Sequence, residues 1–153
     1  MFDIDGVLAD VGHRLAYVER RPKDWKAFFA AAPLDPPLRE GLALARESAK
    51  DCEIVYVTGR PEHCRADTLA WLVRHGLPEG RLIMRQGRDF RPAARAKPDL
   101  LAELARGRVV AVVVDDDAAV CQAYAALGYR VLRATWAEPS ATLVRVQDQD
   151  GRT

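Results

Sequence analysis

The sequence predicts an α/β domain in which a parallel, five-stranded sheet is covered by helices on both faces. Short apolar segments rich in β-branched residues alternate with longer segments of helical periodicity along the 153 residues. Strands that alternate with helices of this length form parallel crossover units, which place helices on both faces of the sheet. Hydrophobic residues make up 49% of the chain, enough for one sizeable core.

The first predicted strand precedes Asp3, and four more follow along the chain. They are expected at Glu53–Val57, Arg81–Met84, Val109–Val114 and Arg130–Ala134. Helices are expected between them at Pro37–Ala49, Pro61–His75, Pro98–Arg106 and Ala118–Leu127. Pro61 and Pro98 suit the first turn of a helix, while Gly76 and Gly128 suit helix ends.

The first strand is unusually short, because only Met1 and Phe2 precede Asp3. Two residues are too few for a hydrogen-bonded ladder at the centre of a sheet. Either a segment or a domain is missing before Met1, or the sheet tolerates the defect. We favour the first explanation.

Composition argues against several classes of protein. The formal net charge is +1, so no strong overall field attracts nucleic acid or a membrane. No apolar run approaches 18 residues, and charges from position 3 onward argue against a cleavable leader. The three cysteines are widely spaced and are expected to be reduced thiols rather than disulfides or zinc ligands. A cytoplasmic protein is therefore predicted.

Polar residues of a few reactive types follow three of the predicted strands. The first strand ends at Asp3 and Asp5, the second at Thr58-Gly59-Arg60, and the fourth at Asp115-Asp116-Asp117. Lys97 stands before a predicted helix. Because reactive groups of a parallel sheet gather at the carboxyl ends of its strands, we expect these side chains to converge.

These residue types together suit transfer of a phosphoryl group. Clustered carboxylates need a hard cation, and Mg²⁺ takes one or two carboxylates, a carbonyl, waters and a phosphate oxygen. One carboxylate can attack phosphorus, while a second protonates the leaving oxygen and later activates water. A hydroxyl, backbone N–H groups at a glycine and a lysine can neutralise the phosphoryl oxygens.

In this order the motifs resemble those of the haloacid dehalogenase superfamily of phosphatases, whose core is Rossmann-like. They are Asp3-Ile-Asp5-Gly6-Val7-Leu8-Ala9-Asp10, Thr58-Gly59-Arg60, Lys97 and Val112-Val113-Val114-Asp115-Asp116. The resemblance implies that Asp3 is the nucleophile and Asp5 the general acid and base, and that Thr58 and Lys97 bind the phosphoryl group. It also implies that Mg²⁺ is held by Asp3, the backbone carbonyl of Asp5, and Asp115 with Asp116 as a further ligand or a supporting group.

Within that superfamily, the chain is similar to the 3′-phosphatase domain of polynucleotide kinase-phosphatases. The similarity rests on Lys23-Asp24-Trp25, on Gly59-Arg60, and on a strand ending at Met84 with Arg88 four residues later. It implies that Gly59, Arg60 and Arg88 contact the substrate. Residues 81–97 are also rich in arginine, and the phosphates of a nucleic-acid backbone are natural partners for such a segment. Asp117 departs from the pattern, since the polynucleotide enzymes tend to carry arginine there.

We therefore expect a phosphatase core at residues 1–136, with a small helical cap inserted at about 11–36, and a C-terminal tail at 137–153. The best helix of the insert is Asp24–Ala31. So small a cap leaves the site open, which suits a polynucleotide end or a phosphorylated protein, and we prefer the 3′ end of a polynucleotide as the substrate. The alternatives are a small phosphometabolite or nucleotide as the substrate, and an inactive relative that only binds. No membrane partner is expected, and Trp71 and Cys64 are interpreted as packed side chains, with His13 on the surface.

Overall fold

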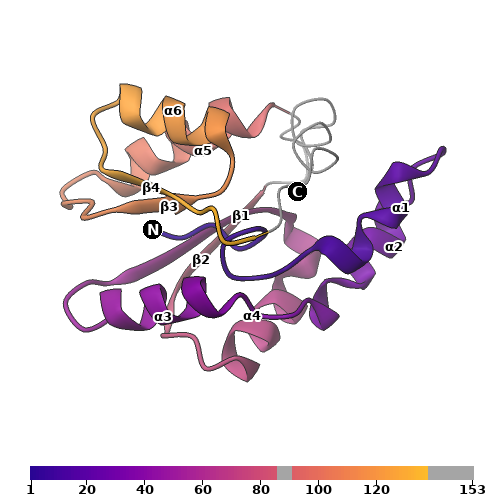
Figure 1. Ribbon diagram of the computed structural model, residues 1–153. Coiled ribbons are helices and arrows are strands. Elements are labelled where there is room, and N and C mark those ends of the chain that lie inside the picture. The colour runs from indigo at the N-terminus through magenta and orange to yellow at the C-terminus, as the bar shows by residue number, and fades with distance from the viewer. Residues whose placement is uncertain (86–90, 138–153) are drawn as a thin grey trace.

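The computed structural model describes residues 1–85 and 91–137 and shows an α/β fold with parallel strands (Figure 1). Its strands are β1 (Ile54–Pro61), β2 (Gly80–Arg85), β3 (Val113–Asp115) and β4 (Val131–Arg133). Its α-helices are α1 (Ala16–Glu19), α2 (Trp25–Ala30), α3 (Arg39–Ser48), α4 (Arg65–Arg74), α5 (Ala93–Leu104) and α6 (Ala118–Ala126). Short 3₁₀ turns occur at η1 (Gly12–Arg14), η2 (Ala32–Leu34) and η3 (Glu62–Cys64).

The strands form two parallel pairs, and the N-terminal segment lies between them. β1 pairs with β2, and β3 pairs with β4. Phe2 makes parallel bridges to Tyr56 on one side and to Val114 on the other. In Figure 1, α5 and α6 lie on one face of these strands, and α3 and α4 lie on the other. The expectation of helices on both faces is confirmed, whereas a regular five-stranded sheet is not seen: the described strands are the two pairs.

The first strand, expected to be too short to pair, does make backbone hydrogen bonds on both sides. The N–H of Phe2 donates to the Val55 carbonyl, and the N–H of Val57 donates back to Phe2. On the other side, the N–H of Asp3 donates to the Val114 carbonyl and that of Val114 to the Met1 carbonyl. These bonds leave Asp3 at the carboxyl end of the segment, in line with the ends of β1 and β3.

Three predicted elements are corrected by the structure. β3 begins at Val113 instead of Val109, because the N-terminal neighbour reaches back only as far as Val112, whose carbonyl accepts from the Met1 amino group, and Val109 is 97% exposed. β1 runs on through the predicted helix start to Pro61. α5 begins at Ala93 instead of Pro98, since Ala93–Ala96 are strong helix formers, and Pro98 sits inside the helix at the loss of one backbone hydrogen bond.

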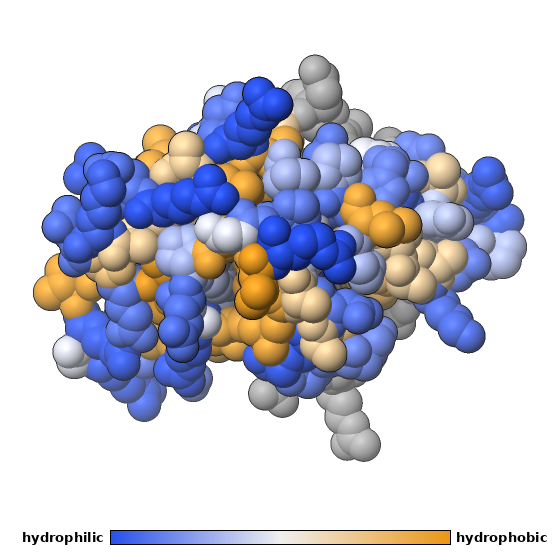
Figure 2. Space-filling view, turned by 90° about the horizontal axis from the view of Figure 1, so that it is seen from below, coloured by the Kyte–Doolittle hydropathy of each residue, from blue (hydrophilic) through white to orange (hydrophobic). Residues whose placement is uncertain are grey.

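The core packs the apolar sides of the strands against the helices. Its largest cluster includes Phe2, Ile4, Tyr56 and Trp71, all nearly inaccessible to solvent. The face on the side of α3 and α4 shows hydrophilic side chains interspersed with smaller apolar groups (Figure 2). Within residues 1–85 and 91–137, no helix is both long and apolar enough to cross a membrane.

Helix α3 packs very closely against the loop that follows Asp5. A Cβ atom added at Gly41 would lie 1.9 Å from the carbonyl oxygen of Val7. The same loop is tied to the start of α3 by hydrogen bonds from Leu38 to the Leu8 carbonyl and from Asp10 to the Pro36 carbonyl. The glycine is therefore required by the close approach of two backbones.

We predict that Gly41→Ala destabilises the protein by about 1–3 kcal/mol, because the methyl group forces the helix away from the Val7 carbonyl. In an unhindered helix the same substitution stabilises by up to about 1 kcal/mol, so the sign of the change is diagnostic. Urea unfolding followed by circular dichroism measures it. Glu40→Ala, on the exposed side of α3, is the control and should change the free energy of unfolding by less than about 0.5 kcal/mol.

Candidate active site

A tight turn directs the first two aspartates to the same end of the strands. After Asp3, the Ile4 carbonyl accepts hydrogen bonds from the N–H groups of Val7, Leu8 and Ala9. Gly6 takes a φ of +80°, and a Cβ atom there would lie 2.2 Å from a carboxylate oxygen of Asp116. Gly6 is therefore needed both for the turn and for the close approach of Asp116.

Lys97 of α5 joins the two strands that carry the acidic residues. Its Nζ donates to Asp3 Oδ2 at 2.8 Å and to Asp115 Oδ2 at 2.7 Å, and all three side chains are buried. Burial alone would lower the pKa of Lys97, but the two carboxylates outweigh it and hold the pKa well above its usual value. The lysine thus stays protonated between the two aspartates.

Asp3, Asp115 and Asp116 together offer a set of oxygen ligands. One carboxylate oxygen from each lies within 4.8 Å of the others. Asp3 Oδ1 and Asp116 Oδ1 are buried and have no hydrogen-bond partner among the described residues. Burial raises the pKa of Asp3 well above its usual value, and burial together with Asp115 raises that of Asp116 to about 7. Three carboxylates with one lysine and two unpaired oxygens fit a hard divalent cation.

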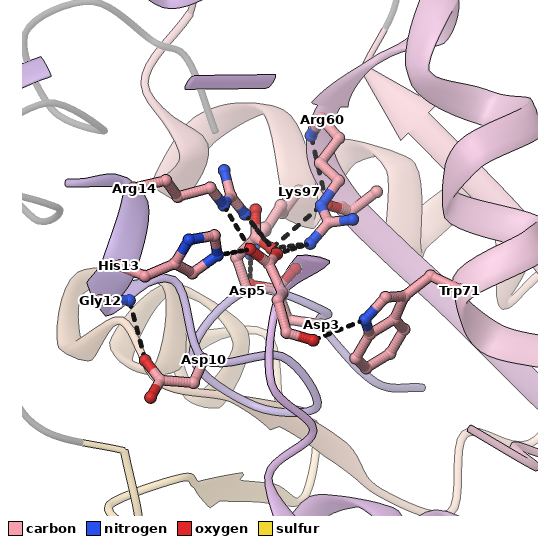
Figure 3. A network of polar contacts seen from close by, with 11 residues as sticks. Asp3, Asp5, Asp10, Gly12, His13, Arg14, Arg60, Trp71 and Lys97 are labelled. Atoms are coloured by element: carbon pink, nitrogen blue, oxygen red, sulfur yellow. Dashed lines mark hydrogen bonds and ion pairs between the residues drawn. The ribbon is translucent and has the colours of Figure 1, made fainter. Parts of the chain in front are cut away.

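Asp5, only two residues from Asp3, belongs to a different polar cluster (Figure 3). Its Oδ1 accepts hydrogen bonds from Arg14 Nη2 at 2.9 Å and from Arg60 Nε at 3.0 Å. Burial raises the pKa of Asp5, but the two guanidiniums more than offset this and lower it to about 2. Asp5 is therefore held ionised.

Asp35 completes this second cluster and was not anticipated from the sequence; nor was Arg14. Asp35 Oδ1 accepts from Arg14 Nε at 2.8 Å, and Oδ2 from Arg14 Nη2 at 2.9 Å and Arg60 Nη2 at 2.6 Å. The backbone carbonyl of Asp35 accepts from the indole of Trp71, and His13 contacts its carboxylate from the partly exposed side. Two buried arginines and two buried aspartates thus pair with each other.

Thr58 and Gly59 lie beside Lys97 at the wall of a small cavity. Its volume is about 240 Å³, and Met84, Arg85, Arg91 and Leu100 also line it. Thr58 is buried, and its hydroxyl oxygen accepts from the N–H of Arg60 at 3.2 Å. Arg60, by contrast, turns its guanidinium toward Asp5 and Asp35. Thr58 and Lys97, which the sequence predicts to bind the phosphoryl group, therefore share this cavity with two further arginines, Arg85 and Arg91.

The remaining predicted residues have simpler positions. Arg88 lies outside the described residues. Asp117 accepts hydrogen bonds from the N–H groups of Ala119 and Val120 and caps the start of α6. Trp71 and Cys64 are buried, as expected. The aspartate at position 117, which departs from the family pattern, thus has a local structural use as the cap of α6, while its backbone N–H donates to the Asp115 carboxylate at 3.1 Å.

The structure therefore brings most of the predicted residues together but divides them into two sets. Asp3, Lys97, Asp115 and Asp116 form one, and Asp5, Arg60, Arg14 and Asp35 form the other. The signal that could have revealed Arg14 and Asp35 is weak. A buried arginine cannot be told from a surface arginine by its neighbours in an arginine-rich chain, and an aspartate before Pro36-Pro37 is typical of a turn.

Two solved structures have a fold similar to that of this chain. The chain superposes on a protein in the "Structure of the Pnkp1/Rnl/Hen1 RNA repair complex" with a TM-score of 0.75 and 19% identity, over 90% of this chain and 42% of the other. A second structure, "Structure of Pnkp1/Rnl/Hen1 complex", gives a TM-score of 0.71 and 20% identity, over 90% of this chain and 45% of the other. This chain thus spans less than half the length of each. No curated protein matches its sequence significantly.

The family model described as "Polynucleotide kinase PNKP phosphatase domain" matches residues 1–137, a range that includes every residue that the structure describes. The match covers both polar clusters, from Asp3 to Asp116. The chain therefore belongs to the family of polynucleotide kinase PNKP phosphatase domains, within the haloacid dehalogenase superfamily, and is a phosphoric monoester hydrolase.

Proposed function

We propose that this phosphatase removes the 3′-phosphate from polynucleotide ends, with Mg²⁺ and through an aspartyl-phosphate on Asp3. One observation carries the proposal. Asp3 is buried with one carboxylate oxygen bound by Lys97 and the other without a partner among the described residues, beside two more carboxylates. A carboxylate oxygen kept apart from hydrogen-bond donors is the form that a nucleophile requires.

Asp3, Asp115 and Asp116 would hold the cation, with the backbone carbonyl of Asp5 as a fourth protein ligand. When bound, Mg²⁺ offsets the repulsion between these carboxylates and polarises an oxygen of the phosphoryl group. Lys97 already neutralises part of this charge through Asp3 and Asp115. It is also positioned to donate to the phosphoryl group next to Asp3, because its ammonium has three protons and two described acceptors.

In the proposed reaction Asp3 attacks phosphorus, and the bond to the 3′ oxygen of the substrate breaks as that oxygen takes a proton through Asp5, which is ionised in this structure and first accepts that proton from solvent as the substrate binds. Asp5 then removes a proton from water, which attacks phosphorus and releases phosphate while restoring Asp3. The ionised state in which Arg14 and Arg60 hold Asp5 suits the second, hydrolytic step. Thr58 and the backbone N–H of Gly59 supply further donors to the phosphoryl oxygens.

Several features favour a polynucleotide as the substrate. Arg85 and Arg91 line the cavity that also touches Thr58, Gly59 and Lys97, and guanidiniums suit phosphates by their planar, forked geometry. Arg88 is proposed as a further contact to the substrate, whereas Arg60, whose guanidinium is buried against Asp5 and Asp35, is proposed to act through Asp5. Both similar solved structures are complexes of Pnkp1, Rnl and Hen1, and one of them is described as an RNA repair complex. The matching family is described as the phosphatase domain of a polynucleotide kinase.

The organisation of the chain remains part of the proposal. We assign residues 1–136 to the phosphatase core, 11–36 within it to a small cap, and 137–153 to a C-terminal tail. The insert holds only the short elements η1, α1, α2 and η2, which supports a cap too small to enclose the site. Free thiols at Cys64 and Cys121, both buried, suit the reducing conditions of the cytoplasm.

We predict that Asp3→Asn lowers phosphate release by at least about 10⁴-fold, because an amide cannot form the acyl phosphate. Release of inorganic phosphate from a 3′-phosphorylated oligonucleotide measures the effect, and circular dichroism confirms that the fold is retained. Asp51→Asn, in the exposed turn before β1 at the opposite end of the strands, is the control and should keep most of the activity. Activity above one per cent in Asp3→Asn would rule out Asp3 as the nucleophile.

Substrate and metal are tested together by comparing a 3′-phosphorylated oligonucleotide with an aryl phosphate, each with Mg²⁺ and with EDTA. We expect a higher kcat/KM for the oligonucleotide and loss of both activities in EDTA, restored by added Mg²⁺. Turnover of the aryl phosphate alone would instead indicate a small phosphometabolite or nucleotide as the substrate. Full activity in EDTA would contradict the assignment of the acidic cluster to a metal.

The cluster in which Arg14 and Arg60 pair with Asp5 and Asp35 can be tested by removing one carboxylate. Asp35→Asn leaves Arg14 and Arg60 with one carboxylate between them and should cost about 3–5 kcal/mol of stability, as does breaking other buried ion pairs. It should also lower kcat/KM, because Arg14 and Arg60, which hold Asp5, lose the second carboxylate that fixes them. Thermal melting and phosphate release report the two effects. An unchanged melting temperature would mean that the cluster does not hold the insert to the core.

A further inference from the structure

The insert forms an arm that projects from the end of the molecule where the site lies. We define the arm as residues 16–30, which contain α1 and α2. In Figure 1 the arm extends to the right, beyond the carboxyl ends of the strands and far from α6. The arm follows directly on η1, which carries His13 and Arg14, so the chain leads from the active-site cluster straight into it.

The base of the arm is rigidly packed against the site. The guanidinium of Arg14 lies over the ring of Phe28, 4.2 Å from its centroid. Phe28 and Phe29 are buried in the core, and Trp25 stacks on Phe29 with ring centroids 5.8 Å apart. Because Arg14 also binds Asp5, the position of the arm is fixed relative to the residue proposed to transfer the proton.

The outer part of the arm carries a patch of positive charge. Arg20, Arg21, Lys23 and Lys26 lie on or next to the connection between the two helices. The side chains of Arg20, Arg21 and Lys26 are exposed, and within the described residues none of these three makes an ion pair. Figure 2 keeps the arm on the right, and hydrophilic side chains predominate at that end.

The acidic residues of the arm do not cancel this patch. Asp24 is occupied as the cap of α2, where its carboxylate accepts from the N–H of Ala27 at 2.9 Å. Glu19 is the only other acidic residue between positions 16 and 30. Four cations against two carboxylates leave the arm positive, although the chain as a whole is almost neutral.

We infer that the arm binds the phosphodiester backbone of the polynucleotide a few nucleotides away from the reacting end. This inference rests on the proposed function. α2 begins at Trp25, three residues or about 5 Å along the helix axis before Phe28, which contacts Arg14, and the cationic connection lies just beyond that end of the helix. A strand whose terminal phosphate reaches Asp3 and that runs toward the arm would bring its next phosphates near Arg20, Arg21, Lys23 and Lys26. Arg20, Arg21 and Lys26 are exposed, while Lys23 is half-buried with its ammonium 5.9 Å from the centroid of the Trp25 ring. Contacts between such cations and phosphates do not depend on base sequence.

The test compares two variants that each lose four positive charges. The arm variant is Arg20→Gln, Arg21→Gln, Lys23→Gln and Lys26→Gln. The matched control is Lys50→Gln, Arg106→Gln, Arg108→Gln and Arg130→Gln, whose residues are exposed and precede β1, β3 and β4 at the opposite ends of the strands. Thermal melting and hydrolysis of an aryl phosphate verify that both variants are folded.

Binding is measured by fluorescence anisotropy with a labelled single-stranded oligonucleotide that ends in a 3′-hydroxyl, so that the readout does not depend on catalysis. We expect the arm variant to bind about 10–100-fold more weakly at low salt and the control variant to bind within about twofold of wild type. The slope of log affinity against log salt should become less steep by about 2–3 for the arm variant, because each lost phosphate contact contributes about 0.7.

Equal weakening of the two variants, or no measurable binding by the wild-type protein, would overturn the inference. An arm that served as a protein-docking surface would likewise leave oligonucleotide binding unchanged in the arm variant. The proposed function is judged separately, by hydrolysis of the 3′-phosphorylated oligonucleotide. If the arm variant binds weakly as expected while the wild-type protein releases no phosphate, the inference about the arm is supported and the 3′-phosphatase proposal fails. If the wild-type protein releases phosphate but the arm variant binds as well as wild type, the 3′-phosphatase proposal is supported and the inference about the arm fails.

Discussion

The ammonium of Lys97, held between the carboxylates of Asp3 and Asp115, is the interaction on which the arrangement of the site depends. The two aspartates end neighbouring strands, and both are buried. Burying a single ion costs several kcal/mol unless it is paired, so two carboxylates at this edge would repel each other and push the strands apart. Lys97 offsets that repulsion and at the same time fixes the start of α5 over the end of the strands.

Lys97 neutralises only part of this charge, and the remainder defines what the site can bind. Asp116 adds a third carboxylate, and one oxygen each of Asp3 and Asp116 lacks a described partner. A fully satisfied cluster would be a structural ion pair and nothing more. An acidic cluster that is incomplete in this way is suited to a cation and to an incoming phosphoryl group, which together supply the missing interactions.

The second cluster serves a different purpose, because it joins parts of the chain that are far apart in sequence. Arg14 comes from η1, Asp35 follows η2, and Arg60 belongs to β1. Arg14 and Arg60 each bind both Asp5 and Asp35, and these contacts attach the insert to the core and hold Asp5, the proposed acid-base residue, in place. The arm then extends from this attachment, so that contacts made at its tip and the chemistry at Asp5 share one rigid base.

The sequence alone determined the alternation of strands and helices, the residues at the strand ends and the family, since each depends on local spacing: apolar runs, glycine turns and Asp3-x-Asp5 stand together in the chain. The tertiary structure decided what depends on contacts between distant segments. Only folding could show that Asp3 and Asp5 belong to different clusters, that Arg14 and Asp35 are buried partners, and that β3 begins where its neighbour Met1 allows pairing. The physical reason is that burial and charge pairing arise between residues tens of positions apart, where no local pattern records them.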